Sequence, residues 1–297
     1  MAKKVGWFFM SIVPLVVSLV LQLGLGVVVA VVYGFIAVGR ESAGGLSDTN
    51  ALYTVFRSHV MEGVSMGIFV YHVVGTLVFM LWYYLAFVRK KGQKGSLKKL
   101  LPVRLLNGKA LIVAVLAGVL LCILANAMVN SAQYIVPEVI ARYEQIMEES
   151  GFGSGPLMFV AAVILAPVGE EFLCRGIIMH YAKKVSGRFW IANMIQALLF
   201  GIMHMNIVQG TYAFVIGLVL GWLYERYQTL VIPIIIHFVV NFSSSTWIFV
   251  IFYFLPQNLF TSMAILAASA AALVLVLYWA GKREENKDIS SDYITYQ

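Results

Sequence analysis

Long apolar runs, separated by short polar or basic stretches, make up most of the chain from Trp7 to Ala280. A membrane-spanning helix needs about 20 mostly apolar residues, so each run of that length predicts one span. Eight runs fit, although the fifth and sixth are short. They are Trp7–Val38, Gly63–Val88, Ala110–Val136, Pro156–Ala182, Phe189–Met205, Val208–Arg226, Thr229–Phe254 and Thr261–Ala280. The pattern predicts an all-α fold, a polytopic membrane helical bundle of about eight transmembrane helices.

The composition agrees with an integral membrane protein and excludes an ordinary soluble domain. The chain is 61% hydrophobic and 12% charged, with a mean hydropathy of +0.87. Soluble domains are about 45–50% apolar and about 25% charged. The first apolar run is much longer than the core of a signal peptide, so we interpret it as a retained span. Cys122 and Cys174 both lie in apolar runs, which predicts buried thiols and no disulfide.

The net charge of +7 comes from basic residues that flank the predicted spans. With the N-terminus inside, inner loops and ends hold 17 of the 21 Lys and Arg residues, which fits the positive-inside rule. We therefore predict cytoplasmic N- and C-termini in a bacterial-type plasma membrane. This distribution indicates membrane lipids as partners and no nucleic acid.

Four stretches outside the spans have compositions that predict their local structure. Residues Arg89–Lys109 form a basic, glycine-punctuated segment that predicts a flexible cytoplasmic loop. Apolar positions recur at helical spacing in Pro137–Ser150, which predicts a short surface helix. The glycine-rich segment Gly151–Pro156 predicts a turn, and the polar tail from Lys282 predicts disorder.

Three polar constellations lie inside apolar runs of the last 130 residues. Ionisable side chains are costly in hydrocarbon, and by default they mark a functional site. The constellations are Glu170-Glu171-x-x-x-Arg175, Phe200-x-x-x-His204 and His237-x-x-x-Asn241. Helix geometry places each i,i+4 pair on one face, and the polar groups of the three spans fall at similar depths. Together they predict one site built from three helices.

Glu170 and Glu171 point about 100° apart on a helix, so they cannot face the same partner. Glu171 and Arg175 have the i,i+4 order that favours an ion pair, which predicts a structural role for both. Glu170 is then available for proton transfer. Pro167 and Gly169 just before it predict a kink or local unwinding that could admit water.

The other histidines, His59, His72 and His180, have no polar neighbours of this kind, and we interpret them as structural. Each constellation taken alone could be a structural contact between helices. Taken together, Glu170, His204, His237 and Asn241 favour hydrolysis inside a membrane. Such a reaction needs a held water, a base and donors for the developing oxyanion.

These three motifs, in this order on consecutive apolar helices, resemble the CPBP family. That family comprises type II CAAX prenyl proteases and bacteriocin-processing or immunity proteins, and is also called the Abi family. The resemblance covers about a third of the chain and divides it into 1–155, N-terminal helices and loops; 156–254, a CPBP-like catalytic core; and 255–297, a last span and cytoplasmic tail.

The resemblance implies an intramembrane endopeptidase. It implies that Glu170 and His204 activate the water, and that His237 and Asn241 stabilise the oxyanion. Glu171 and Arg175 then match the supporting ion pair, with Phe200 as a packing residue. The family implies either metal-free glutamate chemistry, which we favour, or a zinc ion held by Glu170, His204 and His237. No other cofactor is expected.

The expected substrate is a membrane-associated peptide or a lipidated, prenylated CAAX-type protein. The alternative is a non-catalytic membrane protein, regulatory or conferring bacteriocin immunity, that binds a peptide or partner through the same residues. A proton-coupled transporter would also use buried Glu and His. No inverted repeat is visible between the two halves of the chain, which counts against a transporter.

Overall fold

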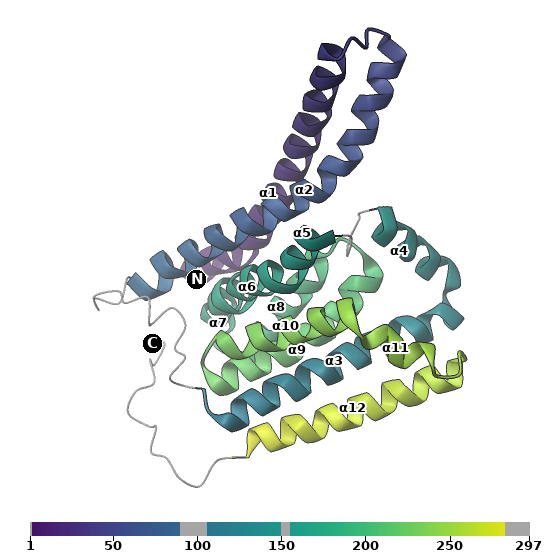
Figure 1. Ribbon diagram of the computed structural model, residues 1–297. Helices are drawn as coiled ribbons and strands as arrows, with labels where there is room; N and C mark the ends of the chain where they lie inside the picture. Colours follow the sequence, from purple (N-terminus) through teal and green to yellow (C-terminus); the bar gives the residue numbers. More distant parts are fainter. Residues whose placement is uncertain (1, 90–105, 150–154, 283–297) are drawn as a thin grey trace.

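The protein is a bundle of helices in the computed structural model, which describes residues 2–89, 106–149 and 155–282 (Figure 1). Within these ranges every regular element is helical, and no strand occurs. The predicted all-α class is confirmed. Most of the predicted basic loop at 89–109, most of the turn at 151–156 and nearly all of the tail from 282 lie outside the described residues.

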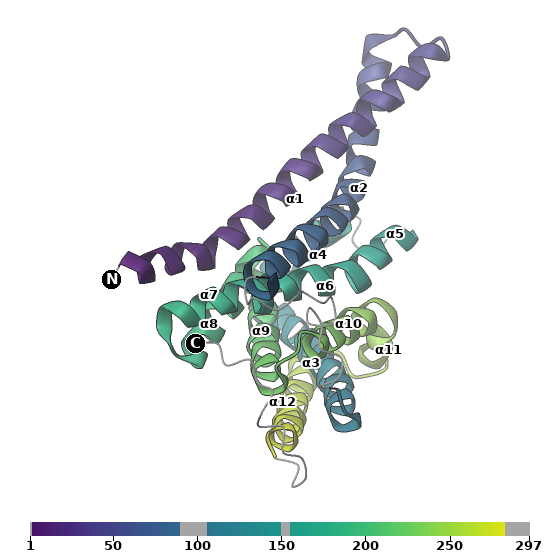
Figure 2. The same cartoon turned by 90° about the vertical axis from the view of Figure 1, so that its left-hand side faces the viewer.

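The first two helices, α1 (Ala2–Ala43) and α2 (Thr49–Tyr83), form a long antiparallel hairpin that projects beyond the rest of the molecule (Figures 1 and 2). A π-helical turn, Tyr84–Val88, extends α2. About 40 residues of helix measure about 60 Å, roughly twice the hydrocarbon thickness. Each helix of the hairpin is therefore longer than the hydrocarbon layer is thick.

Helix extends well beyond the first two predicted spans, Trp7–Val38 and Gly63–Val88, and covers most of residues 39–62. Only residues 44–48 connect the two helices, and the Asp48 side chain caps α2 by accepting from the Ala51 N–H at 2.7 Å. Glycines allow the two helix backbones to pack closely. A Cβ at Gly67 would lie 2.8 Å from the Cα of Gly26.

The remaining helices form the bundle below this hairpin in Figure 1. They are α3 (Gly108–Ile135), α4 (Pro137–Glu149), α5 (Gly155–Val160), α6 (Ala166–Glu171), α7 (Met179–Ser186), α8 (Phe189–Met203), α9 (Ile207–Tyr227), α10 (Val231–Thr246), α11 (Ile248–Tyr253) and α12 (Leu259–Gly281). Two π-helical segments, Ala161–Leu165 and Phe172–Ile178, join α5, α6 and α7 into one continuous run. The helix expected within Pro137–Ser150 is confirmed as α4.

The expected number of eight spans is not confirmed. Among the described residues, six helical segments are long and apolar enough to cross a membrane. The fifth and seventh predicted spans are the shorter apolar helices α8 and α10. The 15 residues of α8 reach only about 22 Å. The chain turns after His204 because Asn206 caps α9, and α10 ends where Trp247 leaves helical geometry.

The run from α5 to α7 lies at the centre of the bundle, packed against α2, α8 and α10. Nearly all of its residues from 166 to 182 are buried. On the far side of α10, α3 packs against both α10 and α12. A Cβ at Gly118 of α3 would lie 2.7 Å from the Val239 side chain, so α3 and α10 lie unusually close. Cys122 and Cys174 are both buried and free, as predicted.

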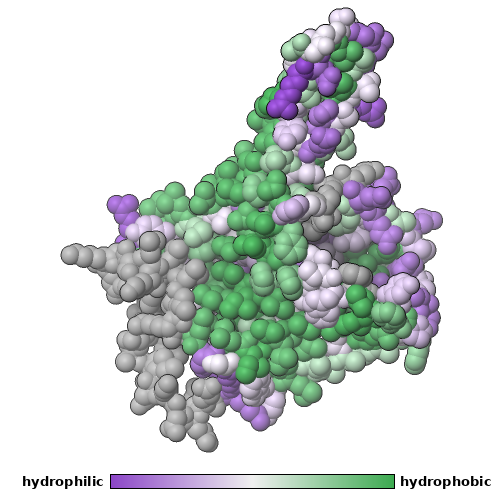
Figure 3. Space-filling model, in the orientation of Figure 1, coloured by the Kyte–Doolittle hydropathy of each residue, from purple (hydrophilic) through white to green (hydrophobic). Residues whose placement is uncertain are grey.

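The surface matches a protein embedded in lipid. Figure 3 shows a broad hydrophobic area over the middle of the molecule, with hydrophilic residues at the tip of the hairpin and around α4. The basic helix ends gather at one side of the bundle: Lys109 Nζ donates to the Lys282 carbonyl at 2.9 Å, and Arg226 Nε donates to the Ala280 carbonyl at 3.1 Å. That this side is cytoplasmic stays a prediction.

Candidate active site

A hydrogen-bonded chain of three buried side chains connects the central helical run to α10. Arg175 Nη1 donates to Glu171 Oε1 at 2.7 Å, and His237 Nδ1 lies 2.9 Å from the same oxygen. A carboxylate paired with arginine can only accept, so His237 carries a proton on Nδ1. Glu171 and Arg175 are fully buried, and the expected ion pair between them is present. Glu171 thus fixes the orientation of the His237 ring.

Arg175 has two further contacts that hold it in place. Its Nη2 donates to the Gly217 carbonyl of α9 at 3.0 Å, and its guanidinium lies over the Phe200 ring at 4.9 Å. A buried charge of this kind is stable only when it is paired and hydrogen-bonded. The ion pair therefore fastens the central run to both α8 and α9.

Glu170 points away from this ion pair, as expected for adjacent residues on a helix. Its Oε2 lies 3.7 Å from His237 Nε2, and its side chain is 14% exposed. His237 thus faces Glu171 with one ring nitrogen and Glu170 with the other. The two glutamates have different surroundings: one is neutralised by arginine, and the other faces an imidazole and a small cavity.

The π-helical segment before α6, Ala161–Leu165, offers two backbone carbonyls to neighbouring helices. The Leu165 carbonyl accepts from the Thr76 hydroxyl of α2 at 3.1 Å, and the Ala162 carbonyl accepts from the Asn241 amide at 2.8 Å. The irregular helix expected around Pro167 is thus observed as π-helical turns, which are frequent at functional sites. Asn241 lies one turn beyond His237 and attaches α10 to the widened helix.

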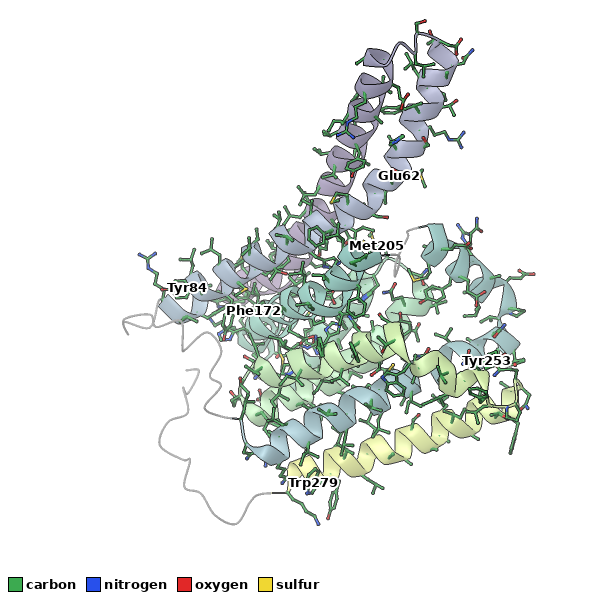
Figure 4. The ribbon with its side chains drawn as sticks, viewed as in Figure 1. Glu62, Tyr84, Phe172, Met205, Tyr253 and Trp279 are labelled. Atoms are coloured by element: carbon green, nitrogen blue, oxygen red, sulfur yellow. The ribbon has the colours of Figure 1, made fainter. Side chains whose placement is uncertain are left out.

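His204 lies at the end of α8, next to Met205, whose position Figure 4 marks. Its Nδ1 is 2.9 Å from the Phe200 carbonyl, so that nitrogen carries a proton, and in the neutral ring Nε2 is an acceptor. The Phe200 ring meets both histidine rings edge-on, with centroids 5.1 Å from His204 and 5.7 Å from His237. Among the described residues, no hydrogen bond or ion pair joins His204 directly to Glu170.

The donor set does not fit a metal ion as it is arranged. Among the described residues, no group of three or more His, Cys, Asp and Glu side chains is placed to hold one. The Phe200 ring contacts both histidine rings edge-on. The set Glu170, His204 and His237 considered from the sequence therefore does not converge on one point.

A second polar network, missed by the sequence analysis, supports Arg175 from α8. The Gln196 amide donates to the Gly217 carbonyl at 2.9 Å and to Asn193 Oδ1 at 2.7 Å, and the Asn193 amide donates to the Leu218 carbonyl at 3.0 Å. Both side chains are fully buried. An amide on an apolar helix has no sequence signature that reveals its partner on the next helix.

The substitution Gly221→Ala tests this network. A Cβ there would lie 1.9 Å from Asn193 Oδ1 and 2.6 Å from Gln196 Nε2, so both amides must move. We expect a loss of about 1–3 kcal/mol in the free energy of unfolding, typical of overpacking, seen as a lower midpoint of thermal unfolding in detergent. Gly24→Ala is the matched control, since nothing lies within 4 Å of its Cβ. An unchanged midpoint for Gly221→Ala would contradict the packing described.

The comparison with known protein families agrees with the motifs. Residues 152–243 match the family described as "Type II CAAX prenyl endopeptidase Rce1-like". A protein of Bacillus subtilis (strain 168), named "Putative membrane peptidase YdiL", is 30% identical over 86 residues. The aligned part is 29% of this chain and 35% of that protein, so the chain spans about a third of the length of this relative. No solved structure matches the chain.

The matched residues contain all three motifs and the helices that carry them, from α5 through most of α10. The likeness predicted from Glu170-Glu171-x-x-x-Arg175, Phe200-x-x-x-His204 and His237-x-x-x-Asn241 is therefore confirmed: residues 152–243 are similar to the Rce1-like family of type II CAAX prenyl endopeptidases.

Proposed function

We propose that this protein is an intramembrane endopeptidase that hydrolyses a peptide bond of a membrane-associated peptide or a prenylated CAAX-type protein. The observation that carries the proposal is the chain from Arg175 through Glu171 to His237, which fixes His237 Nε2 at 3.7 Å from Glu170. A carboxylate and an oriented imidazole side by side in an apolar interior form a pair suited to moving protons. The Rce1-like likeness of the same residues supports this reading.

In the proposed reaction Glu170 is the general base. It accepts one proton from a water molecule as the water oxygen attacks the carbonyl carbon of the scissile bond, and it then gives that proton to the leaving nitrogen. His204 assists from α8, since its unprotonated Nε2 can accept a hydrogen bond from the same water. Both side chains leave the reaction in their starting protonation state.

His237 and Asn241 are proposed to stabilise the negative charge that develops on the carbonyl oxygen. When it carries a proton, His237 Nε2 can donate to that oxygen while Glu171 holds Nδ1. The Asn241 amide has two N–H groups, and one of them is bonded to the Ala162 carbonyl. The other can donate to the oxyanion. Residues 156–254 are accordingly proposed as the catalytic core.

A panel of quenched fluorescent peptides tests the function and its substrate class. Purified protein in proteoliposomes is given farnesylated CAAX peptides and matched peptides without the lipid, each with and without a strong zinc chelator. We expect cleavage of at least one class at a rate that chelation leaves unchanged, because the donor set does not fit a metal. Glu138→Gln, an exposed carboxylate on α4, is the control and should cleave like wild type.

Two other results would contradict parts of the proposed function. Loss of cleavage on chelation, followed by recovery with Zn²⁺, would contradict the metal-free chemistry. Absence of cleavage for every peptide would favour the non-catalytic alternative, in which the same buried groups bind a peptide or partner.

A further inference from the structure

A small cavity separates α2 from the helical turn that carries Glu170. Its lining includes Tyr71, His72 and Thr76 of α2 together with Glu170. Beside the cavity α2 and α6 are in close contact, since a Cβ at Gly169 would lie 2.7 Å from the Thr76 hydroxyl. The cavity has about 10 Å³ of room for the centre of a water molecule. That is about the space that one ordered water occupies.

Two of the four polar side chains in this cavity are already hydrogen-bonded. The Thr76 hydroxyl donates to the Leu165 carbonyl at 3.1 Å, and the Tyr71 hydroxyl pairs with the Ser18 hydroxyl of α1 at 2.6 Å. These bonds fix the walls of the cavity. Each of the two hydroxyls keeps an acceptor lone pair for a water molecule.

The other two, His72 and Glu170, bring unused hydrogen-bonding atoms to the cavity. Within the described part of the chain neither makes a hydrogen bond, and Glu170 Oε2 lies 3.7 Å from His237 Nε2. The His72 ring is held against the Tyr71 ring, with centroids 5.0 Å apart. A water molecule in this cavity would therefore lie between a carboxylate and an imidazole.

We propose that His72 is a further catalytic residue, which holds the attacking water against Glu170 from the α2 side. The inference rests on the proposed function. One water proton goes to Glu170 as the oxygen bonds to the carbonyl carbon, and it passes later to the leaving nitrogen. His72 shares the second O–H with His204 as a hydrogen-bond acceptor, and neither imidazole takes a proton. This residue lies outside the Rce1-like residues 152–243, so the hairpin completes the site.

Cleavage kinetics of His72→Leu and His72→Gln test the proposal. His72→Leu removes the acceptor, and we expect kcat to fall about 100-fold with KM within about twofold. His72→Gln keeps an acceptor oxygen and should recover most of kcat. His59→Leu is the matched control on the same helix, about 20 Å away along the axis, and should behave as wild type. All variants should show the same thermal unfolding midpoint in detergent.

The outcomes distinguish a failure of the role proposed for His72 from a failure of the proposed peptidase function. Wild-type kcat for His72→Leu, in a preparation where Glu170→Gln is inactive, would overturn the role of His72 and leave the proposed function intact. An equal loss in His72→Leu and His72→Gln, or a rise in KM with unchanged kcat, would also overturn it, since packing alone would then explain the effect. A wild-type protein that cleaves no peptide would overturn both.

Discussion

Replacing Glu170 with glutamine should reduce kcat for peptide cleavage by at least about 100-fold, the lower end of what a general base contributes. The amide has nearly the shape of the carboxylate but cannot accept the proton of the attacking water. Glu170 makes no ion pair with Arg175, so the substitution leaves the buried Arg175–Glu171–His237 chain complete. The thermal unfolding midpoint should therefore stay close to that of wild type.

The matched control is Glu62→Gln on the projecting part of α2, where Figure 4 places Glu62 far from the bundle interior. Glu62 is exposed, and the same change of charge there should leave kcat unaltered. A rate for Glu170→Gln within a few fold of wild type would mean that another group is the base. It would remove Glu170 from the mechanism proposed above.

Breaking the buried ion pair should have the largest effect on stability. Arg175→Met leaves the Glu171 carboxylate uncompensated in the interior, which costs about 3–5 kcal/mol for buried pairs. We expect a strongly lowered unfolding midpoint in detergent and loss of cleavage. The control Arg142→Met removes an exposed arginine from α4 and should change neither property.

The double variant Glu171→Met with Arg175→Met separates stability from activity. Replacing both partners of a buried pair by apolar residues is often neutral or stabilising. The Gly217 carbonyl also keeps a donor, because Gln196 Nε2 remains at 2.9 Å. The midpoint should recover, but cleavage should stay lost because His237 Nδ1 no longer has an acceptor. Recovery of both would show that Glu171 does not orient His237.

Local helix geometry explains which parts of the site could be predicted. Glu171 and Arg175 are four residues apart on one helix, so their pairing follows from sequence spacing alone. The same rule separated Glu170 from Glu171. The contact of His237 with Glu171 joins residues 66 positions apart, and it depends on how α10 packs against α6. Similar depth in the membrane placed His237 at the site in advance, but its contact with Glu171 could not be predicted from spacing.

Contacts across helices account for what the sequence analysis missed. His72 was interpreted as structural because its run of α2 carries no second charged group, yet packing places it in the cavity that Glu170 lines. Gln196 and Asn193 lie in an apolar run and find their acceptors on α9. The first two predicted spans are shorter than α1 and α2, because an apolar run does not mark where a helix ends.

The most direct test of the central claim is the identity of the products. Purified wild-type protein in proteoliposomes is incubated with a membrane-associated peptide in H₂¹⁸O, and the products are analysed by mass spectrometry beside those of Glu170→Gln. We predict cleavage at one peptide bond, with one ¹⁸O atom in the new carboxylate, and no product from the variant. No cleavage by wild type, or equal cleavage by Glu170→Gln, would contradict the role of Glu170 as the base of an intramembrane peptidase.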